Sequence, residues 1–152
     1  AGAEKEAEAA LREYLVKNWQ DSTIKLYASL DVVIDNRELE YVEAWLDEHQ
    51  HNAWLLLALG KRCIGRSLWG KARNYLEASS AIEPMPENYL ILARLLEEHM
   101  NDEAAAQEYF RQGLHLLAGT KAELAWASDQ VSLCDTHTAK PGSSPVLKIV
   151  KS

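Results

Sequence analysis

The side chains best suited to hold a metal ion or a haem iron are the five His residues of this chain. His49 and His51 are two positions apart near a predicted helix end, and residues at that spacing do not share a helix face. His99 and His115 fall on the two helices of one predicted hairpin, so they could approach only if its register allowed it. The spacing therefore predicts no metal site, and haem stays an alternative ligand without a supporting motif.

The two Cys residues add no redox or metal motif to this pattern. Cys63 and Cys134 lie far apart, and neither has a second Cys or a His at a metal-ligand spacing. Neither is followed by Pro, the pair common in haem-sensing sites. Cys63 takes the eleventh position of the repeat unit described below, which is usually an aromatic packing site, so we expect it in the core.

No arrangement of nucleophile, base or phosphate-binding loop predicts catalysis. Ser67, Ser79 and Ser80 lack the Gly-x-Ser-x-Gly context of a nucleophile elbow, and no glycine-rich phosphate loop is present. Acidic pairs such as Glu97-Glu98 are typical of solvated helix faces or of first-turn partners of the helix dipole. We therefore expect a protein that is not an enzyme, with no catalytic residues.

The charge balance narrows the choice of partner. The chain has 16 basic and 23 acidic side chains, a formal net charge of −7, whereas nucleic-acid binding needs a basic footprint. One basic segment stands out, and it consists of Lys61, Arg62, Arg66, Lys71 and Arg73. It is interpreted as a solvated face, with an anion or acidic-partner site as the alternative. We expect a protein partner and no nucleic acid.

Length and composition indicate one soluble helical domain. The chain has 152 residues, 47% of them apolar, and one domain is the usual reading of that length. Its longest apolar run, 53–59, is far shorter than the roughly 20 residues that cross a bilayer. Because it lacks an initiator Met and a signal-peptide pattern, we expect a fragment. Any membrane association would then come from an N-terminal anchor of the parent protein.

Apolar periodicity and capping residues predict helix along most of the chain. Asp35 and Glu38 form a predicted capping box, Pro86 suits a first helical turn, and Gly119 is a predicted stop. The expected helices cover residues 3–17, 22–29, 53–64, 68–82, 87–99, 103–117 and about 120–135, with one more beginning after Asp35. Residues 136–152, rich in Pro, Gly and Ser, are predicted to be a flexible tail.

An internal repeat decides which helical fold to expect. At an offset of 34 residues the paired positions agree in type or size, and the pairs are Ala72 with Ala106, Tyr75 with Tyr109, Leu56 with Leu90, Leu76 with Phe110, and Ser79 with Gly113. Thirty-four residues is the period of the tetratricopeptide repeat, a helix-turn-helix unit. Gly60, Ala72 and Pro84 fall where that repeat favours Gly, Ala and Pro. We predict that Gly60 and Ala72 lie where the two helices of a unit cross closely.

The predicted fold is all-α, a right-handed tetratricopeptide superhelix of antiparallel helix pairs in a helical domain over residues 1–135. A degenerate unit covers about 19–52, clear units cover 53–86 and 87–120, and a capping helix covers about 120–135. Degenerate ends are expected because terminal units must cap the stack. A nonrepetitive helical bundle with chance matches is the alternative.

One group of tetratricopeptide proteins is similar in detail. Its resemblance is carried by several short runs, and these are Leu55–Gly60, Leu68–Ala72 with the block Trp69-Gly70-Lys71-Ala72, Tyr75–Ser79, Glu83-Pro84 and Tyr109–Leu114. Over about residues 15–117 the chain resembles the C-terminal domain of the proteobacterial HemY proteins, associated with a late stage of haem synthesis. The resemblance implies an inner-membrane parent protein with a cytoplasmic soluble domain. It implies haem-biosynthesis enzymes as partners and carries over no catalytic residues.

The repeat register also predicts a partner-binding groove. The first helices of tetratricopeptide units present positions 2, 5, 9 and 12–13 to the concave face. In this chain the predicted groove residues are Trp54, Leu57, Lys61, Ile64, Asn88, Ile91, Leu95 and His99. Trp54 could equally lie in the core. Such a mixture of apolar anchors with one cation suits a peptide segment or helix.

Three functions compete on this basis. We expect a noncatalytic interaction scaffold, associated by resemblance with haem synthesis. The alternatives are a carrier or sensor of haem or a porphyrin, which a saturable Soret shift on haemin titration would reveal, and a generic tetratricopeptide adaptor unrelated to haem. An adaptor that clamps acidic C-terminal tails is disfavoured because Leu57 takes the position where that clamp needs a polar residue.

Overall fold

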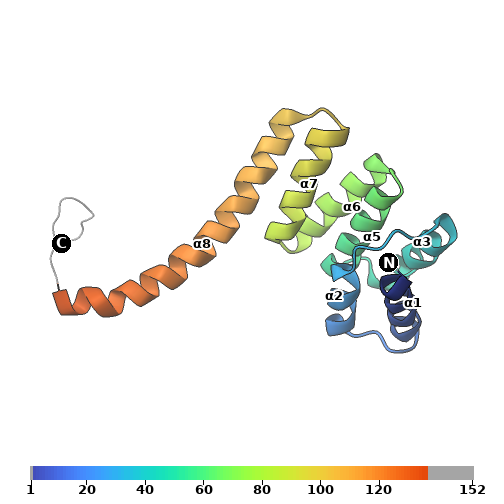
Figure 1. The fold of residues 1–152 in the computed structure, drawn as a ribbon, viewed down its shortest axis with the longest axis horizontal. Coiled ribbons are helices and arrows are strands. Elements are labelled where there is room, and N and C mark those ends of the chain that lie inside the picture. The colour runs from blue at the N-terminus through green and yellow to red at the C-terminus, as the bar shows by residue number, and fades with distance from the viewer. Residues whose placement is uncertain (1, 137–152) are drawn as a thin grey trace. The chain divides into compact units, whose positions relative to one another are not determined.

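The protein is described by a computed structural model that covers residues 2–136. Within those residues all regular secondary structure is helical, which confirms the all-α prediction. The helices are α1 (Gly2–Lys17), α2 (Asp21–Ser29), α3 (Asn36–Glu43), α4 (Leu46–His49), α5 (Ala53–Gly65), α6 (Trp69–Ile82), α7 (Pro86–His99) and α8 (Glu103–Thr136) (Figure 1). The chain divides into two units, Ala1–Leu114 and His115–Ser152. All the sites discussed below lie in the first unit.

The helix starts follow from local chemistry. The Asp35 carboxylate accepts from the Glu38 backbone N–H at 2.8 Å and the Glu38 carboxylate accepts from the Asp35 N–H at 2.9 Å, so the predicted capping box is confirmed. Asn52 caps α5 in a similar way by accepting from the Leu55 N–H at 3.0 Å. Pro86 is the first residue of α7, as predicted.

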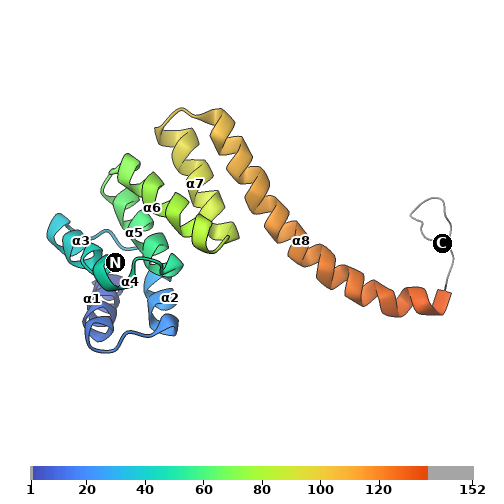
Figure 2. The same cartoon turned by 180° about the vertical axis from the view of Figure 1, so that it is seen from behind.

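The centre of the fold is the pair formed by α5 and α6, with α7 packed on α6 (Figures 1 and 2). Most of α5 is buried, as its apolar run predicts. A Cβ placed on Gly60 would lie 2.6 Å from Cγ of Leu76, a distance that real side chains do not tolerate. Ala72 is fully buried beside it. The predicted close crossing at Gly60 and Ala72 is therefore confirmed.

Contacts on α6 recur on α8 one repeat period later. The Tyr75 hydroxyl donates to Glu43 at 2.6 Å, and the Tyr109 hydroxyl donates to Glu77 at 3.1 Å. Both the two donors and the two acceptors are 34 residues apart, the period of the internal repeat. Ala106, the partner of Ala72 in the alignment, is also buried. The sequence repeat thus corresponds to a repeated set of contacts.

The small residues Ser79 and Gly113 form another such pair. The Ser79 hydroxyl is buried and donates to the Ala53 carbonyl at 2.8 Å, which joins the end of α6 to the start of α5. Gly113 is buried against α7, where an added Cβ would lie 3.3 Å from Cβ of Tyr89. Each small residue therefore lets the second helix of a pair approach the beginning of the first.

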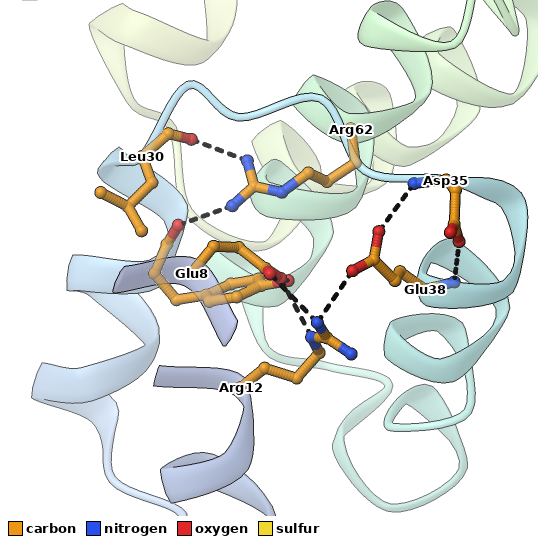
Figure 3. A network of polar contacts seen from close by, with 7 residues as sticks. Glu8, Arg12, Leu30, Asp35, Glu38 and Arg62 are labelled. Atoms are coloured by element: carbon orange, nitrogen blue, oxygen red, sulfur yellow. Dashed lines mark hydrogen bonds and ion pairs between the residues drawn. The ribbon is translucent and has the colours of Figure 1, made fainter. Parts of the chain in front are cut away.

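The N-terminal helices are joined by a buried polar network (Figure 3). The Glu8 side chain of α1 is fully buried, and its carboxylate accepts from the Tyr27 hydroxyl at 2.6 Å and from Arg12 Nε at 3.1 Å. Arg12 also reaches Glu38 at 3.0 Å. These bonds link α1 to α2 and α3, and they satisfy a carboxylate that would be costly to bury alone.

Arg62 extends the polar contacts into the core. Its guanidinium is buried and donates to the Leu30 carbonyl at 2.7 Å and to the Tyr27 carbonyl at 3.1 Å. It lies 4.7 Å from the centroid of the Tyr27 ring, and burial, the largest cause, raises the pKa of that phenol. A cation at the C-terminal carbonyls of α2 is electrostatically favourable. Arg62 is therefore a core residue and not part of a solvated basic face.

The C-terminal helix differs from the prediction. α8 continues without a break from Glu103 to Thr136, so the predicted stop at Gly119 and the separate capping helix over residues 120–135 are wrong. A glycine inside a helix costs only about 1 kcal/mol relative to Ala, and residues rich in Ala, Leu, Glu and Lys surround Gly119. Strong helix formers on both sides offset that cost. The tail predicted over 136–152 lies outside the residues that the structure describes, except for Thr136.

A membrane-crossing helix was not expected from the sequence. Among the helices between residues 2 and 136, none has both the length and the apolar character that crossing a bilayer requires.

Candidate functional site

A groove lies between α5 and α7, where most of the predicted partner-binding residues meet. We call it the α5–α7 groove, with a volume of about 210 Å³. Its lining residues are Asp31, Lys61, Ile64, Ile91, Arg94, Leu95, Glu98 and His99. Five of the eight predicted residues line it, and these are Lys61, Ile64, Ile91, Leu95 and His99.

The floor of the groove is aliphatic. Ile64 of α5 and Ile91 of α7 are half-buried and pack against the core, and Leu95 is 2% exposed. Ile91 and Leu95 lie four residues apart, so they project from the same face of α7. The two isoleucines leave apolar surface open to solvent, and Leu95 anchors that surface to the core.

Lys61 lines the groove, and its ammonium is already paired within the protein. Its side chain is only 11% exposed. Its ammonium donates to the Ala28 carbonyl at 2.9 Å and forms ion pairs with Asp31 at 2.8 Å and Glu87 at 3.4 Å. An ammonium has three N–H donors, and all three have an oxygen partner here. Lys61 therefore joins the C-terminus of α2 to α5 and α7 in one wall of the groove.

The opposite rim carries the accessible polar groups. Arg94 and Glu98 form a loose ion pair at 3.7 Å and are 69% and 49% exposed, so both have free hydrogen-bonding capacity. Next to them the His99 imidazole stacks on the Trp69 ring, with centroids 3.8 Å apart and planes 6° apart. This stack fixes the plane of the His99 ring, which also lines the groove.

Two predicted groove residues face the core. Leu57 and Asn88 are fully buried, so their assignment to an exposed surface is wrong. The Asn88 amide donates to the Leu76 carbonyl at 3.0 Å and ties the first turn of α7 to α6. At Asn88 the physical reason is that α6 packs against α7, whereas Leu57 belongs to the central apolar core. A neighbouring element hides any residue beneath it, whatever its repeat position.

Trp54 does not line the α5–α7 groove and is not fully buried in the core. It is half-buried against the core, and the Lys25 ammonium lies 5.3 Å from the centroid of its ring. It borders a separate depression beside α2, together with Ile82 of α6. The expectation that Trp54 shares one exposed surface with Lys61, Asn88 and Ile91 is therefore wrong. The reasons are that Asn88 is buried and that Trp54 borders the separate depression beside α2.

No metal-binding geometry occurs in the part of the chain that the structure describes, where no three His, Cys, Asp or Glu side chains converge. His49, like His99, is stacked on a tryptophan, in this case Trp19 at 3.6 Å. Cys63 is buried, as predicted, and burial raises the pKa of its thiol to about 11. The α5–α7 groove is also smaller than the roughly 300–1,000 Å³ of small-molecule pockets.

Three groove residues escaped the sequence prediction. Arg94 and Glu98 lie three and seven positions after Ile91, so helical periodicity places them on the face that Ile91 shares. That signal was available. Asp31 follows α2 in an irregular segment, and no periodic pattern in the sequence points to it. Its place in the groove depends on the contact with Lys61.

Comparisons of this chain with protein-family models, with curated proteins and with solved structures found no match.

Proposed function

We propose that this protein is a noncatalytic interaction scaffold of the tetratricopeptide type, and that the α5–α7 groove receives a segment of a partner protein. The observation that carries the proposal is the groove itself, with half-buried Ile64 and Ile91 over buried Leu95 and a rim of charged side chains. Apolar anchors surrounded by a polar rim are the usual arrangement of a protein-binding surface.

The repeated contacts support a tetratricopeptide arrangement. The Tyr75–Glu43 and Tyr109–Glu77 hydrogen bonds are one 34-residue period apart. In such an arrangement α2, α5 and α7 would be the first helices of successive units. First helices line the concave face of these stacks, and stacked repeats form extended concave binding surfaces. The groove lies beside these same helices, which is the location that the proposal requires.

The lining of the groove also restricts which side chains a partner segment can place in it. An aliphatic side chain fits the floor made by Ile64, Ile91 and Leu95. A neighbouring acidic or basic group would then meet Arg94 or Glu98, because both are exposed and only loosely paired. Lys61 contributes little to recognition because its three donors are already engaged. We therefore propose an amphipathic peptide or helix as the partner, bound through one or two apolar anchors.

The resemblance to HemY-type proteins provides a cellular context for this proposal. It rests on sequence runs such as Trp69-Gly70-Lys71-Ala72. On that basis the partners are haem-biosynthesis enzymes at the bacterial inner membrane, and the scaffold is part of a membrane-anchored parent protein. A generic tetratricopeptide adaptor would use the same groove with other partners.

Selection of peptides from a random display library tests the groove directly, because it does not require the natural partner. Peptides that bind the wild-type chain are measured by calorimetry against Ile91→Arg, which puts a charge on the groove floor. Ile82→Arg is the control, because it makes the same substitution at an isoleucine that is 42% exposed and does not line the groove. Both variants are checked for helical content and melting temperature.

We expect selected peptides to share an aliphatic or aromatic anchor and to lose at least about tenfold in affinity on Ile91→Arg, as for a central interface residue. Ile82→Arg should leave their affinity unchanged. Equal affinities for wild type and a well-folded Ile91→Arg protein would refute the groove as the binding surface. The haem-synthesis context is a separate claim, tested by whether peptides from haem-synthesis enzymes compete with the selected ones.

A further inference from the structure

A second depression on the first unit has a lining unlike that of the α5–α7 groove. It lies among α1, α3 and α4 and has a volume of about 320 Å³. Its lining residues are Leu15, Val16, Trp19, Tyr41, Ala44, Trp45, Glu48 and His49. It shares no residue with the groove of the proposed function, so the two sites can be tested independently. We call it the aromatic depression.

Three aromatic rings meet at nearly right angles in this depression. The Trp19 and Trp45 rings lie 5.7 Å apart between centroids with planes at 84°, and the Tyr41 and Trp45 rings lie 6.3 Å apart at 72°. Tyr41 is 48% exposed, and the two tryptophans are half-buried. The His49 imidazole covers one face of Trp19 at 3.6 Å, and the remaining ring faces carry the negative electrostatic potential of aromatic rings. Such a lining attracts cations.

The charged groups around the depression favour a cation further. Glu48 is the only Asp, Glu, Lys or Arg side chain among the lining residues. The Arg12 guanidinium already lies over one face of the Tyr41 ring, 5.9 Å from its centroid, which leaves the other face for a ligand. It is paired with both Glu8 and Glu38, so its charge is more than offset. The site therefore offers π-faces and one uncompensated carboxylate.

The same lining selects among cations. A lysine ammonium brings three N–H donors and an arginine guanidinium five, whereas the lining side chains offer acceptors only at the Glu48 carboxylate, the Tyr41 hydroxyl and the His49 imidazole. A donor buried without an acceptor is costly. A fully methylated ammonium has no N–H donor and loses nothing on this count. We propose that the aromatic depression binds a trimethylammonium group, held by Trp19, Tyr41 and Trp45 with Glu48 as counter-ion.

Choline and its neutral tert-butyl isostere, in which carbon replaces the charged nitrogen, separate a cation site from an apolar pocket. Binding is followed on the full chain through the indole N–H signals of its five Trp. We expect choline to shift the Trp19 and Trp45 signals saturably and to bind about fivefold or more tightly than the isostere. No saturable shift, or equal affinity for both ligands, would overturn the proposal.

Surface variants with matched controls locate the site. Glu48→Gln and Tyr41→Leu should each weaken choline binding by about two- to fivefold at 0.15 M salt. Asp47→Asn removes the same charge from the exposed neighbouring position, which does not line the depression, and should have a smaller effect. If Glu48→Gln and Tyr41→Leu proteins with unchanged melting temperature bind choline like wild type, the assignment is wrong.

A comparison of two ligands identifies the kind of molecule that supplies the trimethylammonium group. Free trimethyllysine carries the same head on an amino acid, so tighter binding of trimethyllysine than of choline assigns a modified protein side chain. Tighter binding of choline assigns a small solute. Both outcomes retain the trimethylammonium site, and failure of both ligands to bind overturns it. Failure of the peptide selection at the α5–α7 groove would leave this result unaffected.

Discussion

The N-terminal helices and the central helices of the first unit are packed by different means. Between α1 and its neighbours a buried polar network adds to the apolar packing of Leu15, with Glu8 accepting from Tyr27 of α2 and Arg12 paired with Glu38 of α3. Between α5 and α6 the buried contact is steric, with Gly60 pressed against Leu76. Small-residue crossings can be repeated along a stack, as Ala106 repeats Ala72, whereas the Glu8 network occurs at one place. The comparison suggests that the centre is the repeating part and α1–α4 a specialised end.

The largest expected effect comes from removing a buried polar side chain that joins α5 to α2. Arg62→Met should lower the free energy of unfolding by about 3 kcal/mol, because it removes the guanidinium that donates to the Leu30 carbonyl and one of the two donors to the Tyr27 carbonyl, the other being the Leu30 N–H at 3.3 Å. Chemical denaturation measures the loss. Arg66→Met, which removes an exposed bond to Asn36, is the control and should cost less than about 0.5 kcal/mol. Equal losses for the two variants would show that burial of Arg62 contributes nothing specific.

The close helix crossings are tested by replacing their buried alanines with a larger side chain. Ala72→Leu and Ala106→Leu should each cost about 1–3 kcal/mol by overpacking, because both alanines are buried between helices. Ala78→Leu, at an exposed position of α6, should be nearly neutral. Denaturation of the three variants gives the comparison directly. A neutral Ala106→Leu beside a costly Ala72→Leu would mean that the second crossing is looser than the first.

A smaller effect compares the repeated hydrogen bonds. Tyr75→Phe and Tyr109→Phe each remove one phenol donor from a carboxylate, at 2.6 Å to Glu43 and 3.1 Å to Glu77. Each should cost about 1 kcal/mol, with the larger loss at Tyr75, whose bond is shorter. Thermal unfolding of both variants measures the difference. Losses of opposite order would contradict the ranking by geometry.

The smallest expected effect is a pH dependence that comes from Glu43. Burial alone would raise the pKa of this carboxyl, but hydrogen bonds from Lys71 and Tyr75 outweigh it and lower the pKa. A lowered pKa in the folded state stabilises the fold fully above the ordinary value of 4.5, and the contribution is lost as pH falls through the folded value.

Denaturation between neutral pH and pH 3 should show this loss as a lower free energy of unfolding. In Glu43→Gln the loss should be smaller than in wild type by less than about 1 kcal/mol, because Lys71 is half-exposed. Glu97→Gln, on an exposed part of α7, is the control. An identical pH dependence in wild type and Glu43→Gln would rule out Glu43 as its source.

Features set by neighbouring residues could be predicted from the sequence. The capping box of Asp35 and Glu38, the start of α7 at Pro86 and the burial of Ala72 and Ala106 all follow from short-range patterns or from the 34-residue repeat. Gly119 is the exception, because a stop signal competes with the helix propensity of both flanks, and here the flanks prevail.

The tertiary structure alone decided which of the predicted groove residues are accessible. Periodicity gives the direction of a side chain about its own helix axis, but it does not say which neighbouring helix covers that direction. Leu57 and Asn88 share a repeat-based assignment with Ile64 and Ile91, yet they are buried while the isoleucines stay open. Lys61 lies in the groove but is neutralised by Asp31 and Glu87, residues distant in sequence. Exposure and charge pairing depend on contacts between helices, which the sequence of one helix does not contain.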